Sequence, residues 1–211
     1  MAMSAPTTRD HAVTRQKRLT AATIGWNGVE GVVAVAAGIA AASVSLIGFG
    51  LDSGIEVSAA LVLAWRLAQE RRTGCKQEAD RLAQRLIAVS FAALALYVGV
   101  ESVRDLALGD QPNASLVGIG IAALSLVVMP VMARAKRKLA PLMGSRAVEA
   151  EAKQTLLCAL LSGALLVGLS ANAALGWWWS DPLAGLFIAG AASYETVSVW
   201  RADSLEDTCC V

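Results

Sequence analysis

Six stretches of mostly apolar residues, each about 20 residues long, dominate this sequence. A segment of that length crosses the hydrocarbon core of a bilayer as an α-helix. Only helices and closed barrels can span lipid, and these blocks are too long and continuous for barrel strands. The sequence therefore predicts an all-α membrane protein, a six-transmembrane-helix bundle. The predicted spans are residues 19–41, 45–65, 86–108, 115–135, 152–175 and 181–200.

Lysine and arginine residues are distributed very unevenly between the connections. Fifteen of the eighteen lie before residue 19, between residues 66 and 85, or between residues 134 and 146. Because positively charged segments stay on the cytoplasmic side of a membrane, we expect both termini to be cytoplasmic, together with the loops after the second and fourth spans. Residues 1–18 are then a cytoplasmic N-terminal tail, residues 19–200 the six-helix transmembrane domain, and residues 201–211 a short cytoplasmic tail.

The parts outside the membrane offer little chemistry. The N-terminal tail lacks the short apolar core of a cleaved signal peptide, and eleven residues after Trp200 are too few for a folded domain. A net charge of +1 gives no reason to expect nucleic-acid binding. Cys75, Cys209 and Cys210 fall on the predicted cytoplasmic side, where disulfides are rare; the last two are either simple tail thiols or groups that hand metal to an entrance. We therefore expect the function to reside in the membrane bundle.

Asp52 and Glu56 are four residues apart inside the second predicted span. This spacing places both carboxylates on one face of a helix. Ionisable groups at membrane depth cost several kcal/mol unless they face a cavity, an ion or each other. The pair therefore indicates a cation, with an internal hydrogen-bond cluster or a helix-packing pair as the alternative.

Two further polar pairs lie at a similar depth, counted from the basic residue at the cytoplasmic end of each span. Gln154 and Cys158 belong to the fifth span, and Asn27 and Glu30 to the first. A lone cysteine in a span usually serves packing, and a lone Gln or Asn usually bonds a neighbouring helix. For Asn27 and Glu30 three roles stay open: metal ligand, proton carrier, or a neighbour that supports the ligands.

Together these residues suggest a metal site near the middle of the membrane. Asp52, Glu56 and Cys158 supply ionisable ligands, Gln154 a carbonyl oxygen, and four ligands from two helices suit tetrahedral zinc. Thiolate favours zinc or cadmium, whereas an all-oxygen set favours magnesium, calcium or manganese. The single histidine, in the N-terminal tail, does not contribute.

Several charged groups nearer the ends of the spans have simpler interpretations. Asp181 with Pro182 indicates the start of a helix, beside three tryptophans typical of an interfacial anchor. Glu101 and Glu195 lie deeper than the rim, and each either lines a water-filled path or pairs with an arginine.

The arrangement resembles the cation diffusion facilitator family of metal/proton antiporters. The second span, SLIGFGLDSGIEVSAAL, is similar to the family's Asp-xxx-Asp signature, with Asp52 at the first position and Glu56 at the second. The fifth, AEAKQTLLCALLS, has Gln154 and Cys158 where the family commonly has His and Asp. WNGVEG and SDPLAGLFIA also resemble family helices, so the likeness covers residues 19–200.

The resemblance implies a transporter, not an enzyme, that exports zinc or cadmium from the cytoplasm in exchange for protons and needs no cofactor. It also implies a short family member without the usual cytoplasmic domain, so that a homodimer would form through the membrane helices. We expect the inner (plasma) membrane as its location. The alternatives are a metal-dependent enzyme acting on lipid head groups, and a receptor or assembly subunit that transports nothing.

Overall fold

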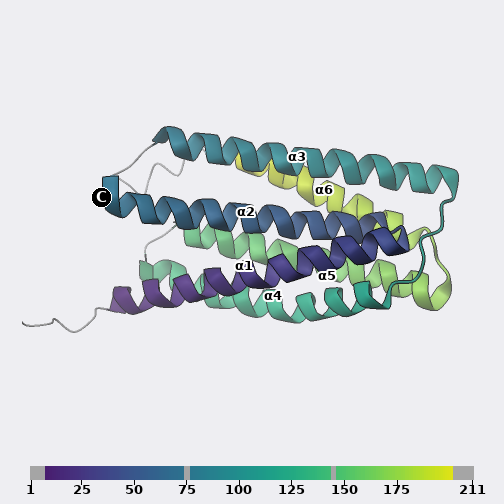
Figure 1. The fold of residues 1–211 in the computed structure, drawn as a ribbon, viewed down its shortest axis with the longest axis horizontal. Coiled ribbons are helices and arrows are strands. Elements are labelled where there is room, and N and C mark those ends of the chain that lie inside the picture. The colour runs from purple at the N-terminus through teal and green to yellow at the C-terminus, as the bar shows by residue number, and fades with distance from the viewer. Residues whose placement is uncertain (1–7, 74–76, 144–145, 202–211) are drawn as a thin grey trace, which may run out of the picture.

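A computed structural model describes residues 8–73, 77–143 and 146–201, which form six α-helices and, within these ranges, no strand. In chain order the helices are α1 (Thr8–Ala41), α2 (Val44–Thr73), α3 (Gln77–Leu108), α4 (Leu116–Met143), α5 (Arg146–Leu175) and α6 (Ser180–Arg201). They lie roughly along one direction as an elongated bundle, and α1 begins and α6 ends toward the same end of it (Figure 1). The prediction of an all-helical bundle is confirmed.

Predicted spans and observed helices agree at one end of the bundle and differ at the other. Where α1, α3 and α5 end and the following helices begin, every boundary lies within one residue of the predicted one; we call this the short-loop end. At the opposite end, α1 begins at Thr8 and α2 continues to Thr73, well beyond the apolar blocks. We call this the extended end. Its additional turns contain many Ala, Arg, Gln and Glu residues, which favour helix without being apolar.

Turns at the short-loop end are tight. Gly109 and Gly176 follow the last residues of α3 and α5 with φ angles of 73° and 68°. This left-handed conformation commonly ends a helix, and glycine adopts it without steric cost. Ala42, with a φ of 52°, turns the chain between α1 and α2.

Asp181 connects α6 with the start of α2 and with the turn between α1 and α2 at the short-loop end. It lies in the first turn of α6, as its position before Pro182 predicts. Its carboxylate accepts hydrogen bonds from the hydroxyls of Ser43, at 2.7 Å, and Ser45, and from backbone amides at the start of α2. Because the first N–H groups of a helix lack intrahelical partners, this carboxylate caps α2 from a neighbouring helix.

The helix α2 lies at the centre of the bundle, in contact with α1, α3, α5 and α6. Its approach to α1 depends on glycine. A Cβ atom added at Gly38 would lie 2.8 Å from the Ile47 nitrogen, and one at Gly50 would lie 2.9 Å from the Gly31 oxygen. Small residues allow such close approach between membrane helices.

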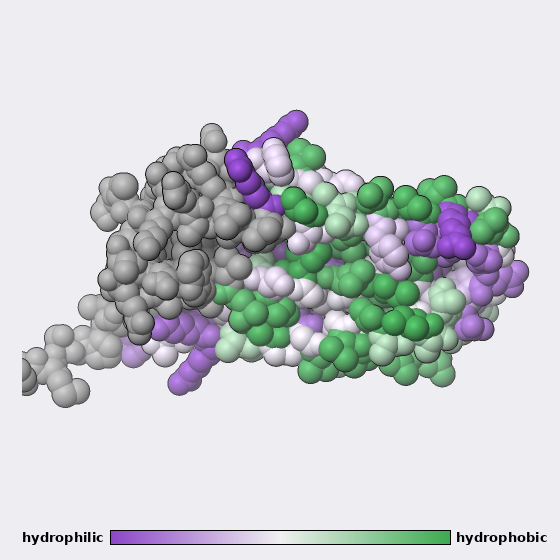
Figure 2. Space-filling view, turned by 45° about the horizontal axis from the view of Figure 1, so that its top comes forward, coloured by the Kyte–Doolittle hydropathy of each residue, from purple (hydrophilic) through white to green (hydrophobic). Residues whose placement is uncertain are grey.

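Apolar side chains spread over the middle of the visible face of the bundle, with polar residues gathered at the short-loop end (Figure 2). Five of the described helices are long and apolar enough to cross a membrane: α1, α2, α4, α5 and α6. Among the residues described, α3 does not meet this criterion. A multi-pass membrane protein is therefore supported, and a sixth span in α3 stays a prediction.

Candidate metal centre

The two acids of α2 point into the bundle. Asp52 and Glu56 are only 5% and 6% exposed. They lie one helical turn apart on the helix that contacts most of the others, so the bundle shields both from lipid. Both carboxylates therefore occupy the interior, on one helix face, as their spacing predicts.

Cys158 of α5 lies close to this pair of acids. The cysteine is free and 1% exposed, and its thiol lies beside the Glu56 carboxylate and within electrostatic range of Asp52. Gln154, one turn away, is partly buried, and its Nε2 donor has no hydrogen-bond partner. A buried donor without an acceptor is costly, so the hydrogen bonding of Gln154 is incomplete in this conformation.

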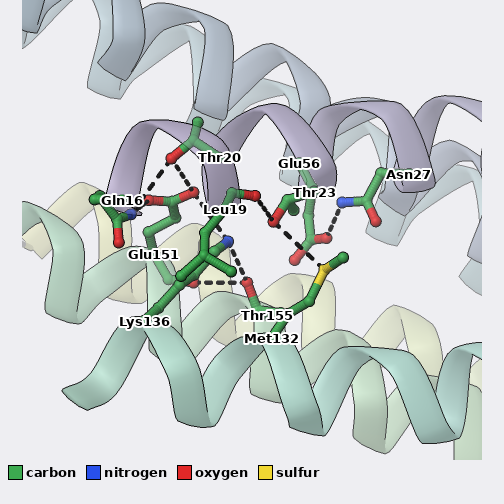
Figure 3. A network of polar contacts seen from close by, with 10 residues as sticks. All are labelled: Gln16, Leu19, Thr20, Thr23, Asn27, Glu56, Met132, Lys136, Glu151 and Thr155. Atoms are coloured by element: carbon green, nitrogen blue, oxygen red, sulfur yellow. Dashed lines mark hydrogen bonds and ion pairs between the residues drawn. The ribbon is translucent and has the colours of Figure 1, made fainter. Parts of the chain in front are cut away.

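Asn27 and Glu30, the two residues of α1 predicted to lie at the depth of the acids, are both buried. Asn27 Nδ2 donates to Glu56 Oε2 at 2.5 Å, so Asn27 contacts one of the predicted ligands (Figure 3). The Glu30 carboxylate lies near the Ser125 hydroxyl of α4 and the Trp26 indole. Neither carboxylate oxygen of Glu30 has a hydrogen bond of good geometry among the described residues.

Three carboxylates thus share one buried region. Glu30, Asp52 and Glu56 interact electrostatically with one another, and Glu195 of α6, which is half-buried, acts on Asp52 as well. Several negative charges held together away from water are unfavourable unless protons or a cation neutralise them. The cluster is therefore suited to hold a cation, protons, or each in turn.

Cys158 lies beside the acids of α2, but the described residues do not form a coordination shell. Across residues 8–73, 77–143 and 146–201, no three Asp, Glu, Cys or His side chains lie close enough together to hold a metal ion. A carboxylate oxygen of Glu56 accepts a hydrogen bond from the amide of Asn27 instead. Binding an ion between α2 and α5 therefore requires side-chain rotation or a small movement of these helices.

A second buried polar network, which was not predicted from the sequence, lies between this cluster and the extended end (Figure 3). Lys136 of α4 is completely buried, with Nζ 2.9 Å from Glu151 Oε1 and donating to Thr155 Oγ1 at 3.1 Å. Gln16 Nε2 donates to Glu151 Oε2 at 3.0 Å, and the Thr20 hydroxyl donates to Glu151 Oε1 at 3.4 Å. Side chains of α1, α4 and α5 therefore meet around one carboxylate.

The burial of Lys136 was not predicted, because it lies in a run of basic residues that is typical of the cytoplasmic end of a span. Its neighbours Arg137 and Lys138 are indeed exposed. The sequence of α1 does indicate a buried polar network. Its polar residues recur at intervals of four and three, which places them on one face of the helix. We call this series the α1 polar stripe: Gln16, Thr20, Thr23, Asn27 and Glu30.

Other charged residues have simpler outcomes. Glu101 pairs with Arg104 of the same helix at 3.2 Å, on the surface, which is one of the two interpretations given above. Cys75, Cys209 and Cys210 fall outside the described residues, and so do the ends of the two predicted tails.

A helical membrane bundle with buried acids at its centre is typical of membrane proteins that move ions. The model of the cation efflux transmembrane domain matches residues 22–206, most of this sequence. The chain belongs to the cation efflux family, as the resemblance predicts, and is a transporter of metal cations rather than an enzyme. The metal is its substrate and no cofactor is needed. No curated protein matches the chain.

Proposed function

We propose that this transporter exports zinc, and also cadmium, from the cytoplasm in exchange for protons, and that Asp52, Glu56, Gln154 and Cys158 bind the ion. The observation that carries the proposal is the meeting of two buried carboxylates from α2 with a buried thiol from α5 in a cation efflux chain. Carboxylate and thiolate both bind zinc, and the thiolate favours zinc and cadmium over magnesium or calcium.

Proton exchange follows from competition for the same groups. Metal ligands must be deprotonated, so an ion that arrives from the cytoplasm displaces protons from the site. Two carboxylates of α2 balance the charge of a divalent ion. Arrival of the ion also frees Glu56 from the amide of Asn27. Once the site faces the other side of the membrane, protons return and the ion leaves.

Alternating access requires the site to open toward one end of the bundle at a time. We assign the extended end to the cytoplasm, because the predicted cytoplasmic segments contain most of the basic residues. Movement of α2 and α5 relative to the other helices would bring the ligands together and expose them in turn. We also propose an inner (plasma) membrane location and a homodimer that forms through the membrane helices.

The lipid head-group enzyme is not favoured, since family members are transporters. The depth of the site argues in the same direction. By helix rise, Glu56 and Asp52 lie about 15 to 21 Å from Arg66 along α2, deep for head-group chemistry.

The decisive experiment measures zinc-driven proton movement in vesicles that contain the purified protein, a trapped pH dye and a trapped zinc dye. Asp52→Ala should abolish both signals, because it removes one of the two carboxylates that balance the ion. Asp110→Ala, which removes an exposed carboxylate from the loop after α3, should leave both signals unchanged. Normal zinc-driven proton flux in Asp52→Ala would exclude the assignment.

The proposed thiol ligand has its own test. Cys158→Asp replaces a soft ligand by a hard one, so the preference for cadmium over zinc should fall, by roughly tenfold if one coordination bond changes the balance by about 1.4 kcal/mol. Uptake of the two metals is compared in the same vesicles. An unchanged ratio would mean that Cys158 packs against the site without binding the ion.

A further inference from the structure

The α1 polar stripe follows the interior of the bundle from the extended end to the acid cluster. Gln16, Thr23, Asn27 and Glu30 are 3%, 4%, 1% and 0% exposed, so the stripe faces other helices and not lipid. Figure 3 shows the first four members of the stripe in a row along α1, facing side chains of α2, α4 and α5. Polar side chains buried at membrane depth commonly mark the path of an ion. The stripe is therefore the candidate polar route from the extended end to the cluster.

The Glu151 carboxylate lies on that route with its oxygens already engaged by several donors. The ammonium of Lys136, a cation that belongs to the chain itself, sits 2.9 Å from Oε1. Other oxygen atoms lie around the same point: Thr155 Oγ1 accepts from the ammonium, and Thr20 Oγ1 contacts the carboxylate. The amide oxygen of Gln16 is buried and has no hydrogen-bond partner, although its nitrogen donates to Glu151.

Oxygen atoms from a carboxylate, hydroxyls and an amide are the ligands of hard divalent cations. We propose that Glu151, Thr155, Thr20 and Gln16 form a second cation-binding site on the route to the metal centre, and that the Lys136 ammonium is its resident cation. A divalent ion that enters from the extended end must displace this ammonium. The inference deepens the proposed function by adding a residue that competes with the substrate.

The displaced ammonium has another acid within electrostatic range, namely Glu56 of the metal centre. When a divalent ion occupies the Glu151 site, Lys136 turns toward Glu56. When the ion moves on to Glu56, Lys136 returns to Glu151. A single tethered positive charge therefore keeps the two sites from holding divalent ions at the same time, because like charges at short range repel strongly in a medium of low dielectric constant.

The test uses Mn²⁺, which prefers oxygen ligands, and counts bound ions per chain by electron paramagnetic resonance on purified protein in detergent. All variants carry Asp52→Ala, so that binding at the metal centre is disabled whether or not the proposed function holds. At micromolar Mn²⁺, Asp52→Ala alone should bind no ion, because the Lys136 ammonium still occupies the Glu151 site. Adding Lys136→Met should create one bound Mn²⁺ per chain, and adding Glu151→Gln to that pair should remove it again.

The matched control is Lys138→Met in the same background, which removes an exposed lysine from the same helix and should create no binding. Should Lys136→Met fail to fold, Lys136→Gln replaces it, since its amide still donates to Glu151 without a charge. Modification of Lys136 by an amine-reactive reagent gives a second measurement in Asp52→Ala alone. Millimolar Mn²⁺ should raise the reactivity of Lys136 at least threefold relative to Lys138. No additional Mn²⁺ in the Lys136 variants, or a reactivity that the ion leaves unchanged, overturns the proposal.

Discussion

The two halves of α1 differ in what they bury. Toward the extended end, its inner face consists of the α1 polar stripe, which ends at Glu30. Toward the short-loop end, the same face continues with Ala34, Gly38 and Ala41, which pack closely against neighbouring helices. One half buries oxygen and nitrogen atoms, and the other buries only small apolar residues. On α1, polar side chains therefore lie on one side of the acid cluster and close packing, which we call the seal, lies on the other.

The largest effect should come from breaking the ion pair in the polar half. Glu151→Ala leaves the fully buried Lys136 ammonium without its carboxylate, which should lower the free energy of unfolding by about 3–5 kcal/mol. Unfolding in mixed detergent and denaturant measures this change. Glu101→Ala, which breaks the exposed pair with Arg104, is the control and should cost less than about 1 kcal/mol. Equal losses would mean that the polar half contributes no more to stability than the surface.

Close packing in the other half should tolerate less added volume than the outer face of the same helix. Gly38→Ala places a methyl group 2.7 Å from Ile47 Cγ1, so we expect a loss of about 1–3 kcal/mol in the free energy of unfolding. Gly28→Ala, where no atom lies within 4 Å of the added Cβ, should instead raise stability by about 0.5–1 kcal/mol through helix propensity. If both variants behaved alike, the seal would not depend on glycine.

A smaller effect should follow from making the polar half less polar without changing its volume. Thr23→Val removes a buried hydroxyl that donates to Leu19 and contacts the Met132 sulfur. If the stripe conducts the ion, transport should slow by roughly threefold to tenfold, the equivalent of one hydrogen bond, with stability nearly unchanged. Zinc uptake into vesicles measures the rate. Ser58→Ala, an exposed hydroxyl of α2 that bonds its own helix, should leave the rate unaltered.

Much of the fold could be predicted from the sequence, and one end of it better than the other. At the short-loop end the apolar blocks stop at Gly109 and Gly176, where the helices also end. At the extended end, propensity keeps the chain helical after hydropathy has fallen, so Thr8 and Thr73 could not be predicted from apolar content.

The candidate site divides in a similar way. Asp52 and Glu56 are visible in the sequence because charge is rare in an apolar block. The role of Lys136 could not be predicted in this way. It depends on which face of α4 packs against Glu151 of α5, and a run of basic residues gives no information about that packing. Depth counting predicted that Cys158 lies near the acids, as it does, yet it could not predict that Asn27 bonds Glu56.

The contacts of Asp181 have a mechanical consequence for how this protein can open. That carboxylate ties the first turn of α6 to the start of α2 and to Ser43 between α1 and α2. Separating these helices at the short-loop end would break the hydrogen bonds that Asp181 accepts. Separating them at the opposite end would leave those hydrogen bonds intact. If the extended end faces the cytoplasm, as proposed, entry of the cargo would spread the bundle about Asp181, and release at the short-loop end would have to break these hydrogen bonds.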